Sequence, residues 1–311
     1  MVNLGFWGQL KKPILALAPL YDVTDPAFRA IIAKYSKPDV MFTEFASADG
    51  LCHPVGKEKI MRDMLKFGEN ERPIVAQLFT SWPNKMCEAA KLCAELKFDG
   101  IDINMGCPDE TIEKQGSGAC LIKNPVLAQE LITAAKEGAL NLPVSVKTRL
   151  GYNQIDLDWL AKLLAAEPAA LIIHLRTRKE MSKVVAHWEV MPEIMKMAKD
   201  SGTLILGNGD VKTLAEARDK CNKYGCDGAM LGRAAFGNPW LFNLDAERPS
   251  EVERKRVLKE HIKLFTELLP QKNFASMKKH FKAYIEGWPG AHELRNKLML
   301  AETAVEALDL L

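Results

Sequence analysis

The chain has 311 residues, 48% of them hydrophobic, and carries 42 Lys and Arg against 40 Asp and Glu. This balance excludes disordered and fibrous classes, and the net charge of +2 does not by itself indicate binding to nucleic acid or membrane. The first residues lack the features of a signal peptide, and no run approaches the roughly 20 apolar residues of a membrane span. The seven cysteines include no C-x-x-C pair, which argues against a zinc ribbon or a disulfide framework. We expect a cytoplasmic protein with reduced thiols, no metal and no membrane contact.

Eight short apolar runs recur between residues 14 and 232, and their starts lie 24 to 44 residues apart. Helical patterns fill several of the gaps, at 86–96, 125–138 and 211–225. Apolar strands that alternate with helices predict a parallel sheet covered on both faces. Eight such units favour a (β/α)8 TIM barrel over a doubly wound open sheet. The runs are 14–18, 40–43, 74–78, 100–104, 144–148, 171–175, 204–208 and 228–232.

The alternation stops after residue 243, where a polar stretch at 245–251 precedes three helical segments, 254–269, 277–288 and 292–311. We therefore expect a barrel domain over 1–243 and a smaller all-helical domain over 244–311. Between residues 254 and 297 there are 11 Lys and Arg against four Asp and Glu. A solvated helix face would explain this excess, and so would an anionic partner.

Polar side chains stand at or near the carboxyl ends of the predicted strands. In a TIM barrel these ends share one mouth, where the active site is built. Polar residues that merely terminate strands would explain one or two of them, but not a Lys and a His inside apolar runs. The residues at the eight ends are Pro19, Glu44, Gln77, Asn104, Lys147, His174, Asn208 and Arg233.

Two glycine-containing segments, 207–211 and 231–239, follow the last two strands. Loops at these places often bind phosphate in such barrels, and Arg233 would add a charged contact. Lys147 needs an anion or a lowered pKa, so it would either form a Schiff base or neutralise a bound cofactor, unless its side chain extends from the strand end to solvent. His174 is equally compatible with a satisfied core residue.

Cys107 lies in a Gly-Cys-Pro turn after the fourth run, ahead of a Gly-rich loop at 116–119. A thiol with an ordinary pKa near 8.5 is mostly protonated at pH 7, so it can donate a proton to a substrate at the mouth. A small packing thiol is the alternative interpretation.

An ordered set of motifs resembles the tRNA-dihydrouridine synthases and runs from about residue 13 to 243. Its parts are APLYDVTDPAFR (18–29), QLFTS (77–81), INMGCP to GSGA (103–119), VKTRLG (146–151), HLRTR (174–178), GNGDV (207–211) and GRAAFGNPW (232–240). The segments KKHFKAYIEG and LRNKL resemble the family's C-terminal helical domain. Leu20 and the segment 179–188 depart from the family pattern.

The resemblance implies FMN at the barrel mouth, NADPH as reductant and reduction of the 5,6 double bond of one tRNA uridine. Cys107 matches the proton donor, Lys147 would stabilise negative charge on the reduced flavin, and Asn104 and Arg178 match residues that hold the uracil. The matched cofactor residues are Ala18, Pro19, Leu20, Gln77, Lys147, His174, Asn208, Gly209, Asp210, Gly232 and Arg233.

The resemblance also gives the basic tail a partner, tRNA, and no stable protein partner is expected. The residues expected to neutralise phosphates are Lys278, Lys279, Lys282, Arg295 and Lys297. Three other functions stay open on the residues alone: a dihydroorotate dehydrogenase-like reductase of a free pyrimidine, a Schiff-base aldolase that uses Lys147, and a tRNA-binding module without catalysis.

Overall fold

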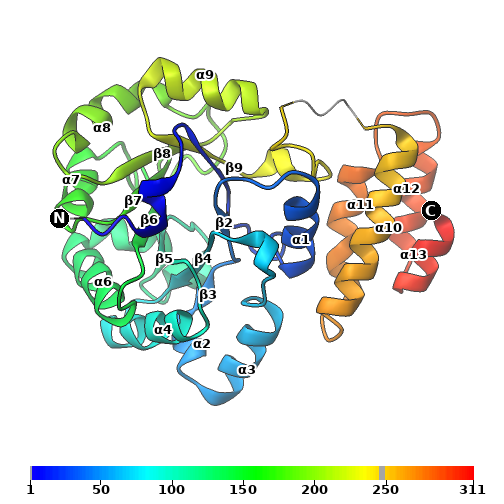
Figure 1. The fold of residues 1–311 in the computed structure, drawn as a ribbon, viewed down its shortest axis with the longest axis horizontal. Helices are drawn as coiled ribbons and strands as arrows, with labels where there is room; N and C mark the ends of the chain where they lie inside the picture. The colour runs from blue at the N-terminus through cyan, green and yellow to red at the C-terminus, as the bar shows by residue number, and fades with distance from the viewer. Residues whose placement is uncertain (1, 245–248) are drawn as a thin grey trace.

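The computed structural model describes residues 2–244 and 249–311, and it confirms the predicted TIM barrel. Figure 1 shows the parallel strands at the centre with helices around them. The sheet runs in the order β1-β9-β8-β7-β6-β5-β4-β2, and a bridge between Ala16 and Val40 joins its two ends. The strands are β1 Ile14–Leu17, β2 Met41–Phe42, β3 Ala46–Ser47, β4 Ile74–Phe79, β5 Gly100–Met105, β6 Val144–Arg149, β7 Ala170–His174, β8 Leu204–Asn208 and β9 Gly228–Leu231.

The second predicted strand, 40–43, is shorter than expected and is continued by a separate piece. β2 pairs with the start of β4, and β3 pairs with its end, at Leu78 and Phe79. Between them the Thr43 hydroxyl accepts a hydrogen bond from the Gln77 backbone N–H at 3.1 Å, in the place of a strand partner. This irregular segment carries Phe45 to the mouth of the barrel, whereas Glu44, at the predicted strand end, is buried and accepts a hydrogen bond from the Asp22 backbone N–H.

Local sequence signals fix the ends of the covering helices. The side chains of Asp25, Asn124 and Thr213 accept hydrogen bonds from backbone N–H groups in the first turn of α1, α6 and α9. Gly225, with φ 74°, ends α9 in the left-handed conformation that favours glycine. The barrel helices are α1 Pro26–Tyr35, α2 Ala48–Leu51, α3 Pro54–Asp63, α4 Pro83–Glu95, α5 Glu110–Glu113, α6 Pro125–Gly138, α7 Leu157–Ala165, α8 Met191–Ala198 and α9 Leu214–Tyr224.

The C-terminal region is helical, as predicted, and packs against α1 (Figure 1). Its core includes Phe265, Phe281 and Leu298, together with Ala27 and Ile31 from α1. The last predicted segment, 292–311, is divided because Thr303 caps a new helix. The helices are α10 Glu251–Leu268, α11 Lys278–Tyr284, α12 Ala291–Leu300 and α13 Ala304–Leu310.

The division into domains at residues 243 and 244 stays a prediction, and most of the polar stretch at 245–251 lies outside the described residues. Within the described ranges, the helices fall short of the length and apolar character that a membrane crossing needs.

Candidate active site

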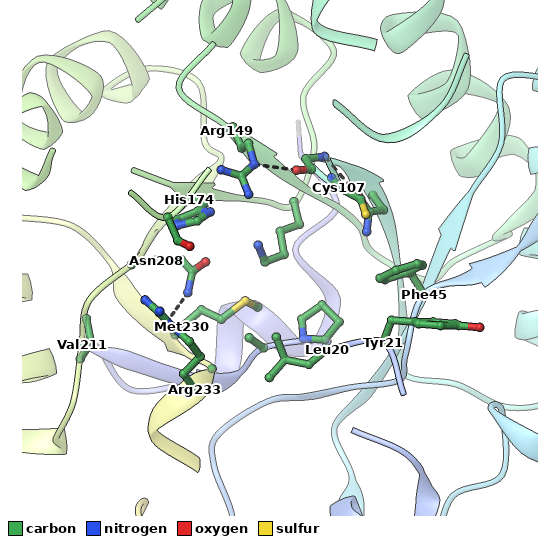
Figure 2. A pocket seen from close by; sticks show the side chains of 18 of the residues that line it. Leu20, Tyr21, Phe45, Cys107, Arg149, His174, Asn208, Val211, Met230 and Arg233 are labelled. Atoms are coloured by element: carbon green, nitrogen blue, oxygen red, sulfur yellow. Dashed lines mark hydrogen bonds between the residues drawn. The ribbon is translucent and has the colours of Figure 1, made fainter. Parts of the chain in front are cut away.

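The carboxyl ends of the strands surround a cavity of about 670 Å³. Thirteen of the fourteen predicted site residues line it. Arg178 is the exception. Figure 2 shows Arg149 and Cys107 on one side of this cavity, Leu20 and Met230 across from them, and Arg233 toward one end. The thirteen are Ala18, Pro19, Leu20, Gln77, Asn104, Cys107, Lys147, His174, Asn208, Gly209, Asp210, Gly232 and Arg233.

The side chain of Asn104 holds the Cys107 turn in place. The Asn104 side-chain oxygen accepts hydrogen bonds from the backbone N–H groups of Gly106 at 3.2 Å and Cys107 at 2.9 Å. Burial raises the pKa of the Cys107 thiol above its ordinary value. The thiol is therefore protonated at neutral pH and faces the cavity as a potential acid.

Two cations from β6, Lys147 and Arg149, lie on the cavity wall. Arg149 is buried, and its guanidinium donates to the carbonyl oxygens of Gly106 at 2.7 Å, Met181 at 3.1 Å and Thr177 at 3.2 Å. Among the described residues, no carboxylate forms an ion pair with either cation. Burial, followed by the repulsion of Arg149, lowers the pKa of Lys147 to about 8. The charge of the buried Asp102 favours the charged form of Lys147, but burial and Arg149 outweigh it. Positive charge that is only partly compensated suits an anionic ligand.

His174 is neutral in this environment. Burial and the nearby cation Arg149 lower its pKa to about 2. Arg176 Nη1 lies 3.1 Å from His174 Nε2, and because a guanidinium only donates, Nε2 accepts and the proton resides on Nδ1. The ring can therefore offer a neutral N–H group, not a further charge.

The loops after β8 and β9 form the end of the cavity that was predicted to bind phosphate. Arg233 is largely exposed there, and its Nη2 lies 3.2 Å from Asp210. The ion pair of Asp210 with Arg176 holds the pKa of Asp210 below its ordinary value. A Cβ at Gly232 would be in ordinary contact with its nearest neighbours Ala18 and Leu20, whereas one at Gly209, where φ is 125°, would clash with Ala186. Asp210 thus orients Arg233, and Gly209 is needed where a side chain would clash with Ala186.

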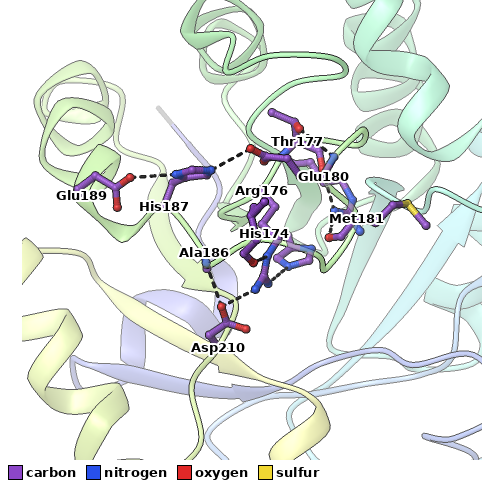
Figure 3. A network of polar contacts seen from close by, with 11 residues as sticks. His174, Arg176, Thr177, Glu180, Met181, Ala186, His187, Glu189 and Asp210 are labelled. Carbon is purple, nitrogen blue, oxygen red and sulfur yellow. Dashed lines mark hydrogen bonds and ion pairs between the residues drawn. The ribbon is translucent and has the colours of Figure 1, made fainter.

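The segment after β7 is pinned by a network of polar contacts (Figure 3). Asp210 accepts from the Ala186 N–H at 2.9 Å, and His187 lies between Glu180 at 3.0 Å and Glu189 at 2.9 Å. The hydrogen bond with Glu180 raises the pKa of His187. This network fixes the segment 179–188, and Ser182 from it reaches the cavity.

Arg178, predicted to contact the substrate, points elsewhere in this structure. Its guanidinium binds both carboxylate oxygens of Glu113 and lies 5.5 Å from the centre of the Tyr152 ring. The predicted phosphate contact Lys279 is likewise engaged, in an ion pair with Asp22. By contrast, Lys282 and Lys297 are exposed.

The sequence interpretation missed several residues that line the cavity. Arg149 could have been found from strand alternation, because it lies two positions after Lys147 and so points to the same face. Tyr21 and Phe45 follow strand ends, and their rings stack at the mouth with centres 5.2 Å apart. No sequence signal marks Ser182, whose position depends on the fold of the segment after β7.

Comparison with known proteins gives the family directly. The family description "Dihydrouridine synthase (Dus)" matches residues 16–311. The chain belongs to the dihydrouridine synthase family. A protein of Staphylococcus epidermidis described as "Probable tRNA-dihydrouridine synthase" is 42% identical, covering 99% of this chain and 95% of the relative. The "Probable tRNA-dihydrouridine synthase 2" of Bacillus subtilis is also 42% identical, with the same coverage.

Solved structures of other barrels resemble this dihydrouridine synthase family member in fold. A morphinone reductase in complex with tetrahydroNAD aligns with TM-score 0.53 at 13% identity, covering 79% of this chain and 91% of the other. Histamine dehydrogenase from Rhizobium sp. 4-9 aligns with TM-score 0.55 at 11% identity, covering 80% and 48%. At such identities the likeness supports the barrel fold alone.

Proposed function

We propose that this protein is an FMN-dependent tRNA-dihydrouridine synthase that uses NADPH to reduce the 5,6 double bond of one uridine in tRNA. The observation that carries the proposal is the cavity itself, where a protonated thiol faces a wall of unpaired cations and an arginine stands at one end. The family and the names of its relatives supply the substrate class.

The residues present fit FMN. Arg233 and the backbone of the loops at Gly209 and Gly232 would hold its phosphate, since charge and close backbone approach are what a phosphate needs. Ala18, Pro19 and Leu20 would line the ring, and Gln77 and His174 would hydrogen-bond to it. Lys147 would lie against the edge that becomes negative on reduction, where a cation in a water-poor site is most effective.

FMN, when bound, supplies the hydride that goes to carbon 6 of the uracil. The protein's own task is the proton. Cys107 holds a proton on Sγ because burial disfavours the thiolate, and it delivers that proton to carbon 5. The hydride and the proton together saturate the double bond, and solvent then restores the thiol.

The uracil must leave its stack to enter the cavity, which costs a few kcal/mol that pocket contacts have to offset. Asn104 and Arg149 face the cavity with N–H groups that suit the uracil carbonyl oxygens. Arg178 would join them only after it leaves Glu113. Exposed lysines of the helical region, Lys282 and Lys297, would neutralise tRNA phosphates.

The test is nucleoside analysis of tRNA from cells that lack this gene and cells that regain it. We expect dihydrouridine at one position to disappear and to return with the intact gene, but not with a Cys107→Ala copy. An unchanged dihydrouridine content in the deletion strain would contradict the proposed function.

A further inference from the structure

A chain of buried hydrogen bonds connects the barrel interior with the Cys107 turn, and Asp102 lies at the end farther from that turn. Strand register places Gln77, Asp102 and Ser145 side by side on β4, β5 and β6. All three side chains are fully buried. Asp102 does not line the cavity, so neither the proposed chemistry nor ligand binding uses it directly.

Each hydrogen bond of this chain is donated toward Asp102. Asp102 accepts from Ser145 Oγ at 2.6 Å and from Gln77 Nε2 at 2.6 Å. Gln77 Oε1 accepts from Asn104 Nδ2 at 3.0 Å. Asn104 Oδ1 in turn accepts from the backbone N–H groups of Gly106 and Cys107.

Both ends of this chain have a fixed polarity. Burial raises the pKa of Asp102 to about 6, so above neutral pH the group is mainly a carboxylate. A carboxylate can only accept hydrogen bonds and a backbone N–H can only donate them. Gln77 must therefore turn its NH2 toward Asp102 and its oxygen toward Asn104. Asn104 must then turn its oxygen toward the Cys107 turn. With one N–H of each amide used in the chain, the second N–H of each remains for the cavity that both residues line.

We propose that Asp102 is a positioning residue that sets the direction of the chain through Gln77 and Asn104, so that this wall of the cavity offers only N–H donors. Lys147 and Arg149 extend the same donor-only wall from β6. Such a wall suits the carbonyl oxygens of FMN and of uracil, and it gains strength in a site shielded from water. The idea rests on the proposed function only in the identity of these ligands.

The direction can be tested by reversing it with substitutions of nearly equal shape. In Asn104→Asp, the carboxylates at positions 102 and 104 both require the NH2 of Gln77, so one contact becomes a repulsion between oxygens. Adding Asp102→Asn lets Gln77 turn over. Its NH2 then faces position 104, its oxygen accepts from position 102, and Ser145 still donates to position 102. Every hydrogen bond is made again: the two that Gln77 makes with positions 102 and 104 are reversed, and those from Ser145 and from the backbone N–H groups of Gly106 and Cys107 keep their direction.

We expect Asn104→Asp to lower the unfolding midpoint of the apoprotein by about 5 °C or more. The double variant should regain most of that loss, and Asp102→Asn alone should cost less than Asn104→Asp. FMN affinity, measured by quenching of flavin fluorescence, should stay roughly tenfold or more weaker in the double variant, because a carboxylate has replaced a donor on the wall. If the chain of hydrogen bonds served stability alone, the double variant would regain FMN affinity together with its unfolding midpoint.

Asn208→Asp serves as the matched control. Asn208 also lines the cavity, but its Nδ2 donates to the Met230 carbonyl at 2.7 Å and takes no part in the chain. Adding Asp102→Asn to Asn208→Asp should rescue nothing.

Additive losses of stability in the double variant would overturn the proposal, and so would recovery of FMN affinity along with stability. Should Asn104→Asp fail to fold, a double variant that folds supports the proposal and one that also fails overturns it. Unfolding needs no ligand. A wild-type protein that binds FMN but forms no dihydrouridine would therefore remove the proposed function and leave the chain of hydrogen bonds standing.

Discussion

Two groups of positive charge in this molecule differ in their partners. On the cavity wall, Lys147 and Arg149 have no carboxylate within ion-pair distance among the residues that the structure describes. Where the helical region meets the barrel, Lys272 lies 3.0 Å from Asp22 and 3.2 Å from Asp25, and Lys279 also pairs with Asp22.

Whether a cation has an acidic partner distinguishes the charges that bind a ligand from those that hold the helical region against the barrel. Burial alone would raise the pKa of Asp22, but its hydrogen bonds with Lys279 and Lys272 hold that pKa below its ordinary value, as expected for a satisfied contact. In the cavity, burial lowers the pKa of both Lys147 and Arg149, and the charge of Arg149 lowers that of Lys147 further, so the two cations suit an anionic ligand. A charge count along the sequence treats the two groups alike, but only the unpaired group marks a ligand site.

The largest effect should come from the thiol beside the unpaired cations. Cys107→Ala should lower dihydrouridine formation by roughly 10²- to 10⁴-fold, because the proton donor is gone. FMN content and flavin reduction by NADPH should stay close to wild type. Cys120→Ala is the matched control, a half-buried cysteine of the following loop. Wild-type turnover in Cys107→Ala would remove the proton-donor role.

Removing an unpaired cation should weaken FMN binding more than removing a paired one. Lys147→Met should raise the FMN dissociation constant by roughly tenfold or more, since a charge-assisted contact is lost. Lys272→Met should instead lower the unfolding midpoint and leave FMN affinity within about twofold. Titration of each apoprotein with FMN, together with thermal unfolding, checks both. Equal losses of affinity would contradict the distinction.

The pH dependence of FMN affinity tests whether Lys147 is the cation that the bound FMN meets. Lys147 titrates with a pKa of about 8, and an anionic ligand favours its charged form. FMN affinity should be level between about pH 7 and pH 8 and should fall above pH 8, by at most about tenfold per pH unit, because binding must then recover a proton. Lys147→Met should flatten this profile. A wild-type profile that is flat from pH 7 to about 9 would exclude Lys147 as the titrating group.

The smallest effect concerns the helical region. Lys282→Gln should raise the KM for tRNA a few-fold and reduce the salt dependence of binding, as for the loss of one phosphate contact. Lys279→Gln should mainly lower stability, because its ammonium is paired with Asp22. If the two variants changed the KM equally and left stability alone, the ion pair at Asp22 would not be a structural contact.

The barrel and most of the cavity could be predicted because the determining signals are local. Apolar runs give the strands, and one residue at each strand end gives the mouth, which is how Gln77, Asn104 and Lys147 were found. Whether a charged side chain forms an ion pair could not be predicted, since its partner comes from a distant part of the sequence. Arg178 pairs with Glu113 and Lys279 with Asp22 across 65 and 257 residues of sequence. Asp102 escaped notice because it lies inside an apolar run, and only strand register places it beside Gln77.

The most direct test of the account is to incubate the purified protein with FMN, NADPH and an unmodified tRNA transcript, and to measure the mass of the digested nucleosides. We predict that one uridine gains two hydrogens, with NADPH consumed in equal amount, and that Cys107→Ala yields almost none. A transcript that stays unmodified while the protein binds FMN and oxidises NADPH would contradict the account.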